Sequence, residues 1–457
     1  MSNLAYETGG RINVSSRIER LPKSKYHVYL TMLLTGAWFV ESIDLGGLGY
    51  ILPTVGKYFN LTKSMMGLVA STALVGMFLG SVCTGSLSDK YGRKKMLMGS
   101  MAFWGIAGAL SGMAWSFESL LFFRFLLGVG IGAQIPVGLA WLSELVQSRY
   151  RGKYISIYQC TLPLGIAVAG LLTYLFLPKY GWQGVLFVEA LPAFWLLVIW
   201  KFVPESARWL ESVGRYEDAD RVVKEMEERV QKSIQRDLPP IEVVAPAIGV
   251  IAKNDSKKDS KRGFSELLTR QYAIRLIMSA VLMFTAMLAY YGLTMWLSTL
   301  LMAKGFSLTK SIVFVSLISL GGMPSFLLVP FLVEKIGRKW SVFVSMVLMA
   351  IFAYAYGSST AVIYVIILGL IFQLFQVSMT TVLGIYVPEL WPTHTRVTGT
   401  GVVYGVGRVG AIVGPLAMGF IMQGYGPMEV FMFSSVVLLV GAFVVMILGP
   451  ETKGKVM

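Results

Sequence analysis

Residues 89–94 read Asp-Lys-Tyr-Gly-Arg-Lys, and residues 334–339, 245 positions later, read Glu-Lys-Ile-Gly-Arg-Lys. The same displacement carries Glu144 onto Glu389. Matches in two separate stretches at one displacement predict that the chain contains two copies of one unit. Each quoted stretch is a short polar segment between apolar runs. The class of structure that the repeated unit forms therefore depends on these flanking runs.

The surroundings are strongly apolar. Hydrophobic side chains make up 55% of the 457 residues and charged side chains 14%, whereas about 25% of the residues in a soluble domain are charged. Because a helix needs about 20 apolar residues to cross a bilayer, this composition predicts an all-α integral membrane protein and excludes a soluble enzyme. Twelve apolar stretches qualify as spans, at residues 27–52, 65–88, 96–116, 118–146, 154–177, 183–203, 272–302, 308–333, 341–358, 360–388, 396–423 and 428–449.

The repeat and the spans together predict the organisation of the chain. Six spans separate equivalent points, so the two copies have the same orientation, related by an axis along the membrane normal. We expect five segments: an N-terminal segment 1–26, a six-helix bundle 27–203, an insert 204–270, a second six-helix bundle 271–449 and a tail 450–457. Apolar residues at helical spacing predict surface helix within the insert, and its later part, 239–262, has the composition of a linker.

The distribution of positive charge predicts which side faces the cytoplasm. The chain carries a net charge of +15, and 33 of its 40 Lys and Arg residues lie on the side that holds both termini. Only five lie on the opposite side: Lys57, Lys63, Lys179, Lys304 and Lys310. Lys and Arg favour cytoplasmic loops, so we expect a multi-pass protein of the plasma (inner) membrane with both termini cytoplasmic. This explains the basic charge without a nucleic-acid partner.

The motifs resemble those of a known transporter family. The stretch from Gly85 to Lys95 is similar to the signature loop of the major facilitator superfamily, and 332–339 is a weaker copy. Arg124-Phe-Leu-Leu-Gly128-Val-Gly130-Ile-Gly132 and Pro204-Glu-Ser-Ala-Arg208 resemble the branch shared by sugar porters, organic ion transporters and bacterial metabolite:proton symporters, including nicotinate-type transporters. This resemblance implies two rocking halves of six helices and transport by alternating access.

The charged residues of the repeated motifs are candidates for a cytoplasmic gate. A carboxylate four residues before an arginine at the membrane edge can pair with a neighbouring helix end, and such pairs break when the halves rock. The alternative is that these charges only set the topology. The candidates are Asp89, Arg93, Glu144, Arg151, Glu334, Arg338, Glu389 and Arg396.

Two carboxylates within the first span are candidates for carrying protons. Glu41 and Asp44 are three residues apart and share a helix face. Two neighbouring carboxylates in a low dielectric cannot both ionise cheaply, and ionisable residues inside a membrane are costly unless they serve a function. The family resemblance implies that Asp44 pairs with Arg124 of the fourth span. A static buried ion pair is the alternative.

The candidate substrate residues indicate an anion with an apolar body. The Gln-rich motif of sugar porters is absent from the seventh span, which instead offers Tyr290, Tyr291 and Trp296. Hydrogen bonding remains available from three glutamines, each of which has bridging between helices as its alternative role: Gln159, Gln373 and Gln376.

The eleventh span places Arg408, with Tyr404 one turn before it, among glycines. Arginine keeps its charge in proteins, so Arg408 needs a carboxylate of the protein or an anionic ligand. Resemblance to organic anion transporters favours the ligand, and a structural salt bridge is the alternative.

The sequence also limits the chemistry. Two cysteines and two histidines give no disulfide framework and no metal-ligand spacing, so neither a metal nor another cofactor is expected. The glycines of 128–132 lie in an apolar helix without a Walker lysine, which favours close helix packing over nucleotide binding. We expect a monomer that takes up a small aromatic or heteroaromatic monocarboxylate, nicotinate-like, with protons. A sugar or polyol symporter, an organic ion exchanger without proton coupling and a receptor that only senses ligand stay open.

Overall fold

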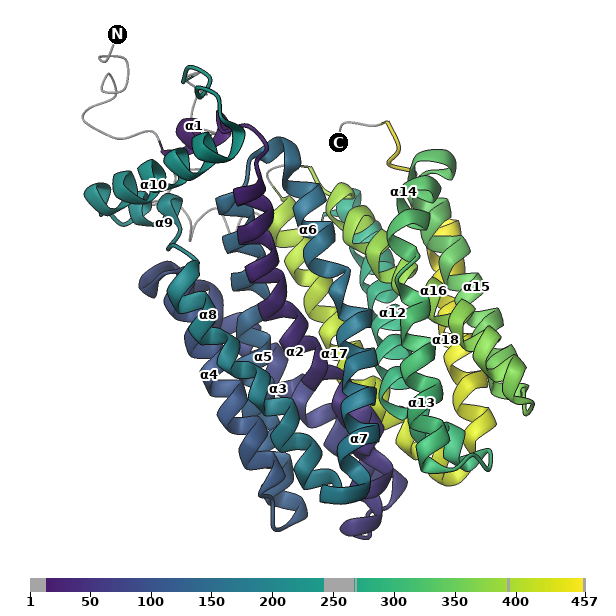
Figure 1. Ribbon diagram of the computed structural model, residues 1–457. Coiled ribbons are helices and arrows are strands. Elements are labelled where there is room, and N and C mark those ends of the chain that lie inside the picture. Colours follow the sequence, from purple (N-terminus) through teal and green to yellow (C-terminus); the bar gives the residue numbers. More distant parts are fainter. Residues whose placement is uncertain (1–13, 242–266, 268, 393–394, 455–457) are drawn as a thin grey trace.

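The computed structural model describes residues 14–241, 267, 269–392 and 395–454, and the regular structure in these ranges is helical (Figure 1). The first six spans are formed by α2 (Lys25–Tyr58), α3 (Lys63–Tyr91), α4 (Arg93–Gly112), α5 (Phe117–Leu145), α6 (Arg151–Gln159), α7 (Thr161–Ala190) and α8 (Trp195–Phe202). The last six are formed by α12 (Arg270–Ala303), α13 (Leu308–Ser319), α14 (Ser325–Ile336), α15 (Arg338–Ser358), α16 (Val362–Glu389), α17 (Arg396–Gly424) and α18 (Pro427–Leu448).

The helices account for twelve membrane crossings. Ten helical segments in the described part of the chain are long and apolar enough to span a membrane. One of them, Ser148–Phe202, is 55 residues long and turns at Gly181, where φ is +66°, so it supplies two spans. The other additional span is α4, which begins with three cationic residues. The predicted all-α membrane fold is therefore confirmed, and the non-helical residue Gly181 separates the fifth span from the sixth.

The glycines of α5 serve helix packing, as the sequence predicted. A Cβ atom at Gly128 or Gly132 would clash with the backbone of α3 at Ala73 and Met77, and one at Gly130 would press on Trp104 of α4. The missing side chains therefore let three helices approach closely, which is how small residues promote helix association in membranes.

Two glycines at equivalent places turn the chain between spans. Gly92 separates α3 from α4 at φ +96°, and Gly337 separates α14 from α15 at φ +90°. Backbone at positive φ favours glycine. A Cβ at these positions would also meet the carboxyl groups of Glu205 and Glu451, so the two turns tolerate no side chain.

The two groups of six spans touch mainly at the end of the molecule opposite α1 (Val14–Glu19). The contacts run between α3 and α17, between α7 and α13 and between α2 and α12. Ser64 donates from its backbone N and its Oγ to Gln423 Oε1 at 3.1 and 2.7 Å, and Ser71 Oγ donates to the carbonyl of Ile412 at 2.7 Å. This end, which we call the distal end, is therefore closed.

The insert carries surface helices, as its pattern predicted. Helices α9 (Ala207–Ser212) and α10 (Tyr216–Ile234) follow α8, and α1 packs against both in a small apolar cluster (Figure 1). We call the end of the molecule that carries α1, α9 and α10 the terminal end. The predicted linker at 239–262 lies almost entirely outside the described residues.

Helix α1 is attached to α10 by charged hydrogen bonds. Arg17 binds Asp220 and Glu227 at 2.6 Å each, and Arg20 binds Glu227 at 2.7 Å. Burial alone would raise the pKa of Glu227, but the hydrogen bonds from Arg17 and Arg20 outweigh it and lower that pKa below its ordinary value. The stabilisation of α1 by Glu227 is therefore present above the ordinary glutamate pKa and is lost as the pH falls through the lowered one.

We expect Arg17→Ala to release α1 at neutral pH and acidification to release it in the parent. Ion pairs at the protein surface contribute about 1 kcal/mol or less each, so amide exchange of residues 14–21 should rise a few-fold. Hydrogen-exchange mass spectrometry measures this, after correction for the intrinsic pH dependence of exchange. The control is Arg221→Ala on α10, whose one ion pair among the described residues is with Asp218 at 3.3 Å; it should leave these amides protected. Unchanged exchange in Arg17→Ala would contradict the attachment.

Candidate functional site

A buried ion pair lies within the first six spans. Asp44 of α2 and Arg124 of α5 are 2% and 1% exposed, and Asp44 Oδ2 lies 3.9 Å from Arg124 Nη1. The two residues that the family resemblance paired are thus brought together. At this distance the pair has electrostatic attraction without a close hydrogen bond, and both carboxylate oxygens lack a hydrogen-bond partner among the described residues.

A third buried carboxylate, Glu189 of α7, joins this pair. It is fully buried and interacts electrostatically with Asp44 and Arg124. Its carboxyl group occupies the space where Gly47 of α2 has no side chain. Sequence reasoning missed Glu189, although an isolated acid in the apolar run 183–203 was a usable signal.

Glu41 lies on the same helix as Asp44 but in different surroundings. It is fully buried, both of its carboxylate oxygens lack a hydrogen-bond partner among the described residues, and it is repelled by Asp44 and attracted by Arg408. Because α2 belongs to the first six spans and α17 to the last six, Glu41 and Arg408 face each other between the two groups of spans. The buried acids outnumber Arg124, so their charges cannot all be balanced within this group of residues.

Arg408 lies on an accessible face of α17. It is partly exposed, and no hydrogen bond or ion pair joins it to another described residue. Tyr404 is 38% exposed and interacts electrostatically with Arg408. Gly401, exposed and with free space around its Cβ position, continues the same face toward the terminal end. The arrangement leaves a guanidinium group available to an anion.

Tyr290 and Tyr291 of α12 contact each other, whereas Gln376 of α16 bonds to α12. Tyr290 and Tyr291 meet edge to face with ring centroids 5.1 Å apart. Gln376 is fully buried and donates to the carbonyl of Tyr290 at 3.3 Å and to Thr294 Oγ1 at 3.2 Å. It therefore bridges α16 and α12, which was the alternative reading of this glutamine.

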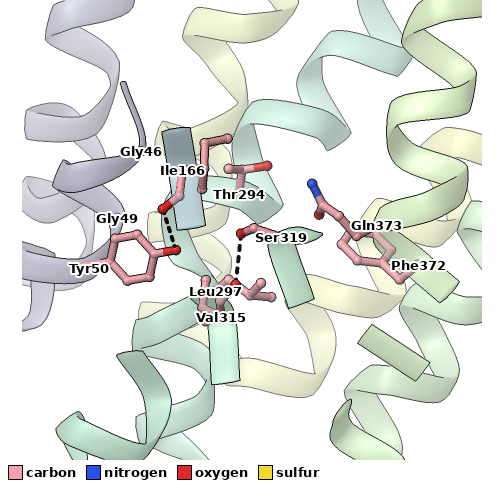
Figure 2. Close-up of a pocket in the computed structure, with 10 residues that line it drawn as sticks. All are labelled: Gly46, Gly49, Tyr50, Ile166, Thr294, Leu297, Val315, Ser319, Phe372 and Gln373. Carbon is pink, nitrogen blue, oxygen red and sulfur yellow. Dashed lines mark hydrogen bonds between the residues drawn. The ribbon is translucent and has the colours of Figure 1, made fainter. Parts of the chain in front are cut away.

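Gln373 lines a small cavity on the distal side of the centre. Figure 2 shows Gln373 and Phe372 across this cavity from Tyr50, whose hydroxyl donates to the carbonyl of Ile166 at 3.1 Å. The cavity volume is about 10 Å³, which is room for a water molecule and far too little for an organic acid. The distal side is thus packed shut.

Two further predicted substrate residues, Trp296 and Gln159, differ in their surroundings. Trp296 is fully buried and donates from its indole to the carbonyl of Pro415 at 3.0 Å, so its polar atom is already used in packing α12 on α17. Gln159 is the exposed last residue of α6. Trp296 therefore offers no free polar group, whereas the amide of Gln159 forms no hydrogen bond with another described residue.

The gate candidates form two equivalent charge networks at the terminal end. Arg93 binds Asp89 at 2.8 Å and Glu144 at 3.1 Å. In the second copy, Arg338 binds Glu389 at 3.2 Å. Each network joins helix ends of one group of six spans, and within the described ranges no ion pair connects the first six spans with the last six.

Three of the gate candidates lie outside these pairs. Arg151 donates to Ser148 Oγ at 3.2 Å, and Arg396 donates to the carbonyl of Trp391 at 3.3 Å. Glu334 is exposed and forms no ion pair among the described residues, whereas its counterpart Asp89 pairs with Arg93. Arg338, four residues after Glu334, pairs with Glu389.

Two further carboxylates complete the networks, and sequence reasoning gave them no role. Glu205 accepts hydrogen bonds from the backbone N–H groups of Arg93 and Lys94 at 3.0 and 3.1 Å, and Glu451 accepts one from Arg338 at 2.9 Å. Both therefore cap the helix that follows the glycine turn. Their recurrence in Pro204-Glu-Ser and Pro450-Glu-Thr was the available signal.

Comparison with known proteins gives consistent matches over nearly the whole chain. A family model described as "Sugar (and other) transporter" matches residues 13–457. The niacin transporter NiaP of Acinetobacter baylyi is 32% identical over 445 residues, which are 97% of this chain and 98% of that protein. The 4-hydroxybenzoate transporter PcaK of Pseudomonas putida is 28% identical over 422 residues, covering 91% of this chain and 90% of that protein.

A solved structure supports the fold. The xylose transporter XylE from E. coli, in a partially occluded inward-open conformation, matches with a TM-score of 0.73 over 95% of this chain and all of that chain, at 17% sequence identity. At this identity the likeness concerns the fold.

Proposed function

Because the chain belongs to the sugar (and other) transporter family of the major facilitator superfamily, and is therefore a transporter rather than an enzyme, we propose that it takes up a small aromatic monocarboxylate together with protons. The observation that carries this proposal is Arg408, a partly exposed residue that attracts the buried Glu41 but forms no hydrogen bond or ion pair with another described residue.

The direction of access follows from the closed distal end. Lys and Arg concentrate on the terminal side, so we place that side in the cytoplasm by the positive-inside rule. The hydrogen bonds between Ser64 and Gln423 and between Ser71 and Ile412 then seal the outer side. We therefore infer that the substrate reaches Arg408 from the cytoplasmic side when the outer side is sealed in this way.

The substrate class is inferred from charge and aromatic surroundings. A planar guanidinium group receives a carboxylate through two charge-assisted hydrogen bonds. Tyr404, which interacts electrostatically with Arg408, is proposed to contact the planar ring of the substrate. The relatives fit this class, because niacin and 4-hydroxybenzoate are both small aromatic monocarboxylates. A polyol would require more free donors and acceptors than Gln373 and the buried Gln376 supply.

Proton coupling is assigned to the buried acids. Asp44 and Glu189 share one arginine, Arg124, and a buried carboxylate without a partner is stabilised by binding a proton. Protonation and release at these groups would change the net charge between α2, α5 and α7. Such a change supplies a driving force for moving the helices relative to one another.

The charge network of Arg93 is proposed to control the cytoplasmic gate. We expect Arg93→Ala to loosen the ends of α3, α4 and α5 and to favour the inward-open state without abolishing substrate binding. The labelling rate of a cysteine at Gly401, in a variant without Cys83 and Cys160, should rise several-fold.

Arg338→Ala provides the matched comparison for this prediction. Arg338 binds one carboxylate where Arg93 binds two, so its replacement should have the smaller effect. Equal labelling in Arg93→Ala and the parent would remove the gate assignment.

Transport by purified protein in liposomes tests the function. An inward proton gradient should drive accumulation of nicotinate or 4-hydroxybenzoate, and collapse of the gradient should reduce uptake to equilibration. Competition with xylose and with the neutral amide of each acid separates an anion carrier from a sugar or polyol symporter. Binding of the acids without flux would identify a sensor, and flux independent of the gradient would identify an exchanger or facilitator.

A further inference from the structure

A second pocket lies at the terminal end, outside the proposed transport route. It has a volume of about 240 Å³, compared with about 10 Å³ for the cavity between Gln373 and Tyr50. Its walls come from the turn between α3 and α4 and from α9 and α10. The lining residues that carry charge are Lys94, Lys95, Glu205, Arg215, Asp218 and Arg221.

The acids of this pocket are already bound within the protein. Glu205 accepts the backbone N–H groups at the start of α4. Asp218 pairs with Arg215 at 2.6 Å and with Arg221 at 3.3 Å. Neither carboxylate is therefore free to neutralise a further cation in the pocket.

The cations are only partly compensated. Lys94 donates from Nζ to the carbonyl of Trp200 at 2.7 Å. Lys95 is exposed and forms no ion pair with any residue that the structure describes. The Arg221 side chain is 76% exposed, and its one ion pair within the described residues is the contact to Asp218 at 3.3 Å. Four cationic side chains face two acidic ones, which leaves an excess of two positive charges for an anion.

The pocket lies where two spans leave the membrane. Tyr91 ends α3 and Phe202 ends α8, and Tyr91, Trp200 and Phe202 are exposed. Lys90 and Lys201 lie over the rings of Tyr91 and Phe202 at 5.2 and 5.4 Å. Exposed aromatic rings beside lysines are typical of the depth of lipid headgroups. An anion at this depth belongs to the lipid surface.

The internal repeat provides a comparison within the same molecule. At the place of Lys95 the second copy of the loop carries Trp340. The glycine turn, the arginine and its carboxylate partner are present in both copies. Since the second copy forms the same turn and the same arginine–carboxylate pair with Trp340 at this place, neither feature requires Lys95. We therefore look for the role of Lys95 in the pocket itself.

We propose that this pocket binds the phosphate group of an anionic phospholipid of the cytoplasmic leaflet, held by Lys95 and Arg221. The choice of leaflet rests on the orientation proposed above, whereas binding itself does not depend on orientation or on the identity of the transported substrate. Basic pockets at the cytoplasmic ends of membrane helices bind anionic headgroups by this chemistry. A bound headgroup would connect α4 with α10.

Lipid titration followed by native mass spectrometry tests this proposal. Detergent-solubilised protein is titrated with phosphatidylglycerol or phosphatidylcholine, and the fraction that retains one lipid is measured. Phosphatidylglycerol should bind more tightly, and the double replacement Lys95→Gln/Arg221→Gln should weaken its binding roughly 25-fold, at about fivefold per cation. Lys95→Arg should retain binding. Lys339→Gln, in the second copy, is the matched control and should bind like the parent.

Three results would overturn the proposal. They are equal retention of the two lipids by the parent, unchanged phosphatidylglycerol binding in the double variant, and an equal loss of binding in Lys339→Gln. Inorganic phosphate is titrated separately by thermal shift. If phosphate alone stabilises the parent as strongly as phosphatidylglycerol and is lost in the double variant, the site binds a free anion and the lipid assignment is wrong. Transport assays are unaffected by any of these outcomes, so the proposed function is judged separately.

Discussion

Replacing Arg408 with alanine is expected to remove nearly all affinity for the transported carboxylate. The loss should be about 2–5 kcal/mol, because the substrate's charge would be left in the protein without its partner, which corresponds to at least about a 25-fold rise in Kd. Arg408→Lys should also impair binding, since an ammonium group cannot form the two parallel hydrogen bonds of the guanidinium fork. Binding of labelled nicotinate or 4-hydroxybenzoate to purified protein measures both effects.

The neutral amide of the same acid is the control for Arg408. It should bind poorly to the parent and lose little further in Arg408→Ala, because it places no charge on the arginine. A structural salt bridge behaves differently, since its removal damages folding and every ligand alike. If the acid and its amide lose affinity by the same factor, the anion assignment is wrong and a sugar or polyol becomes the better candidate. The thermal stability of each variant shows whether it is folded.

Replacing Asp44 with asparagine is expected to abolish accumulation driven by a proton gradient while substrate exchange across the membrane partly survives. Asparagine keeps the shape of the side chain but cannot carry a proton. It also leaves Arg124, 1% exposed and 3.9 Å away, with Glu189 as its remaining acidic neighbour. Breaking a buried pair by removing one partner typically costs about 3–5 kcal/mol of stability, so a lower Tm should accompany the loss of coupling.

Two variants distinguish coupling from stability in this prediction. Glu189→Gln and Glu41→Gln change the other buried acids, and each should weaken accumulation less than Asp44→Asn. The combination Asp44→Asn/Glu189→Gln/Arg124→Gln removes all three charges, so it should recover Tm but not accumulation. Counterflow exchange and gradient-driven uptake are measured in the same liposomes. Accumulation at the parental level in Asp44→Asn would remove this residue from the proton pathway.

The residues of the candidate site could be predicted from the sequence where an ionisable side chain stands in an apolar span. Asp44 and Arg408 are ionisable residues in apolar helices and were identified on that ground, whereas Arg124 was identified through the family resemblance. Glu189 has the same property, but its place near the middle of 183–203 gave no indication of a partner. Its relation to Asp44 arises because Gly47 of α2 leaves space for its carboxyl group, which is a contact between residues distant in the chain.

The sequence by itself determined the all-helical membrane fold, the repeat and the motifs of the charge networks. These depend on local properties: the length of apolar runs, glycine at the turns and the count of Lys and Arg in loops. The tertiary structure decided that Trp296 and Gln376 hold helices together, that Arg93 pairs with Glu144 while Arg151 does not, and that Glu189 joins Asp44 and Arg124. The reason is that helices such as α2 are apolar on all sides, so periodicity does not reveal which face meets a neighbour. Helix rotation and close approach at glycines fix those contacts.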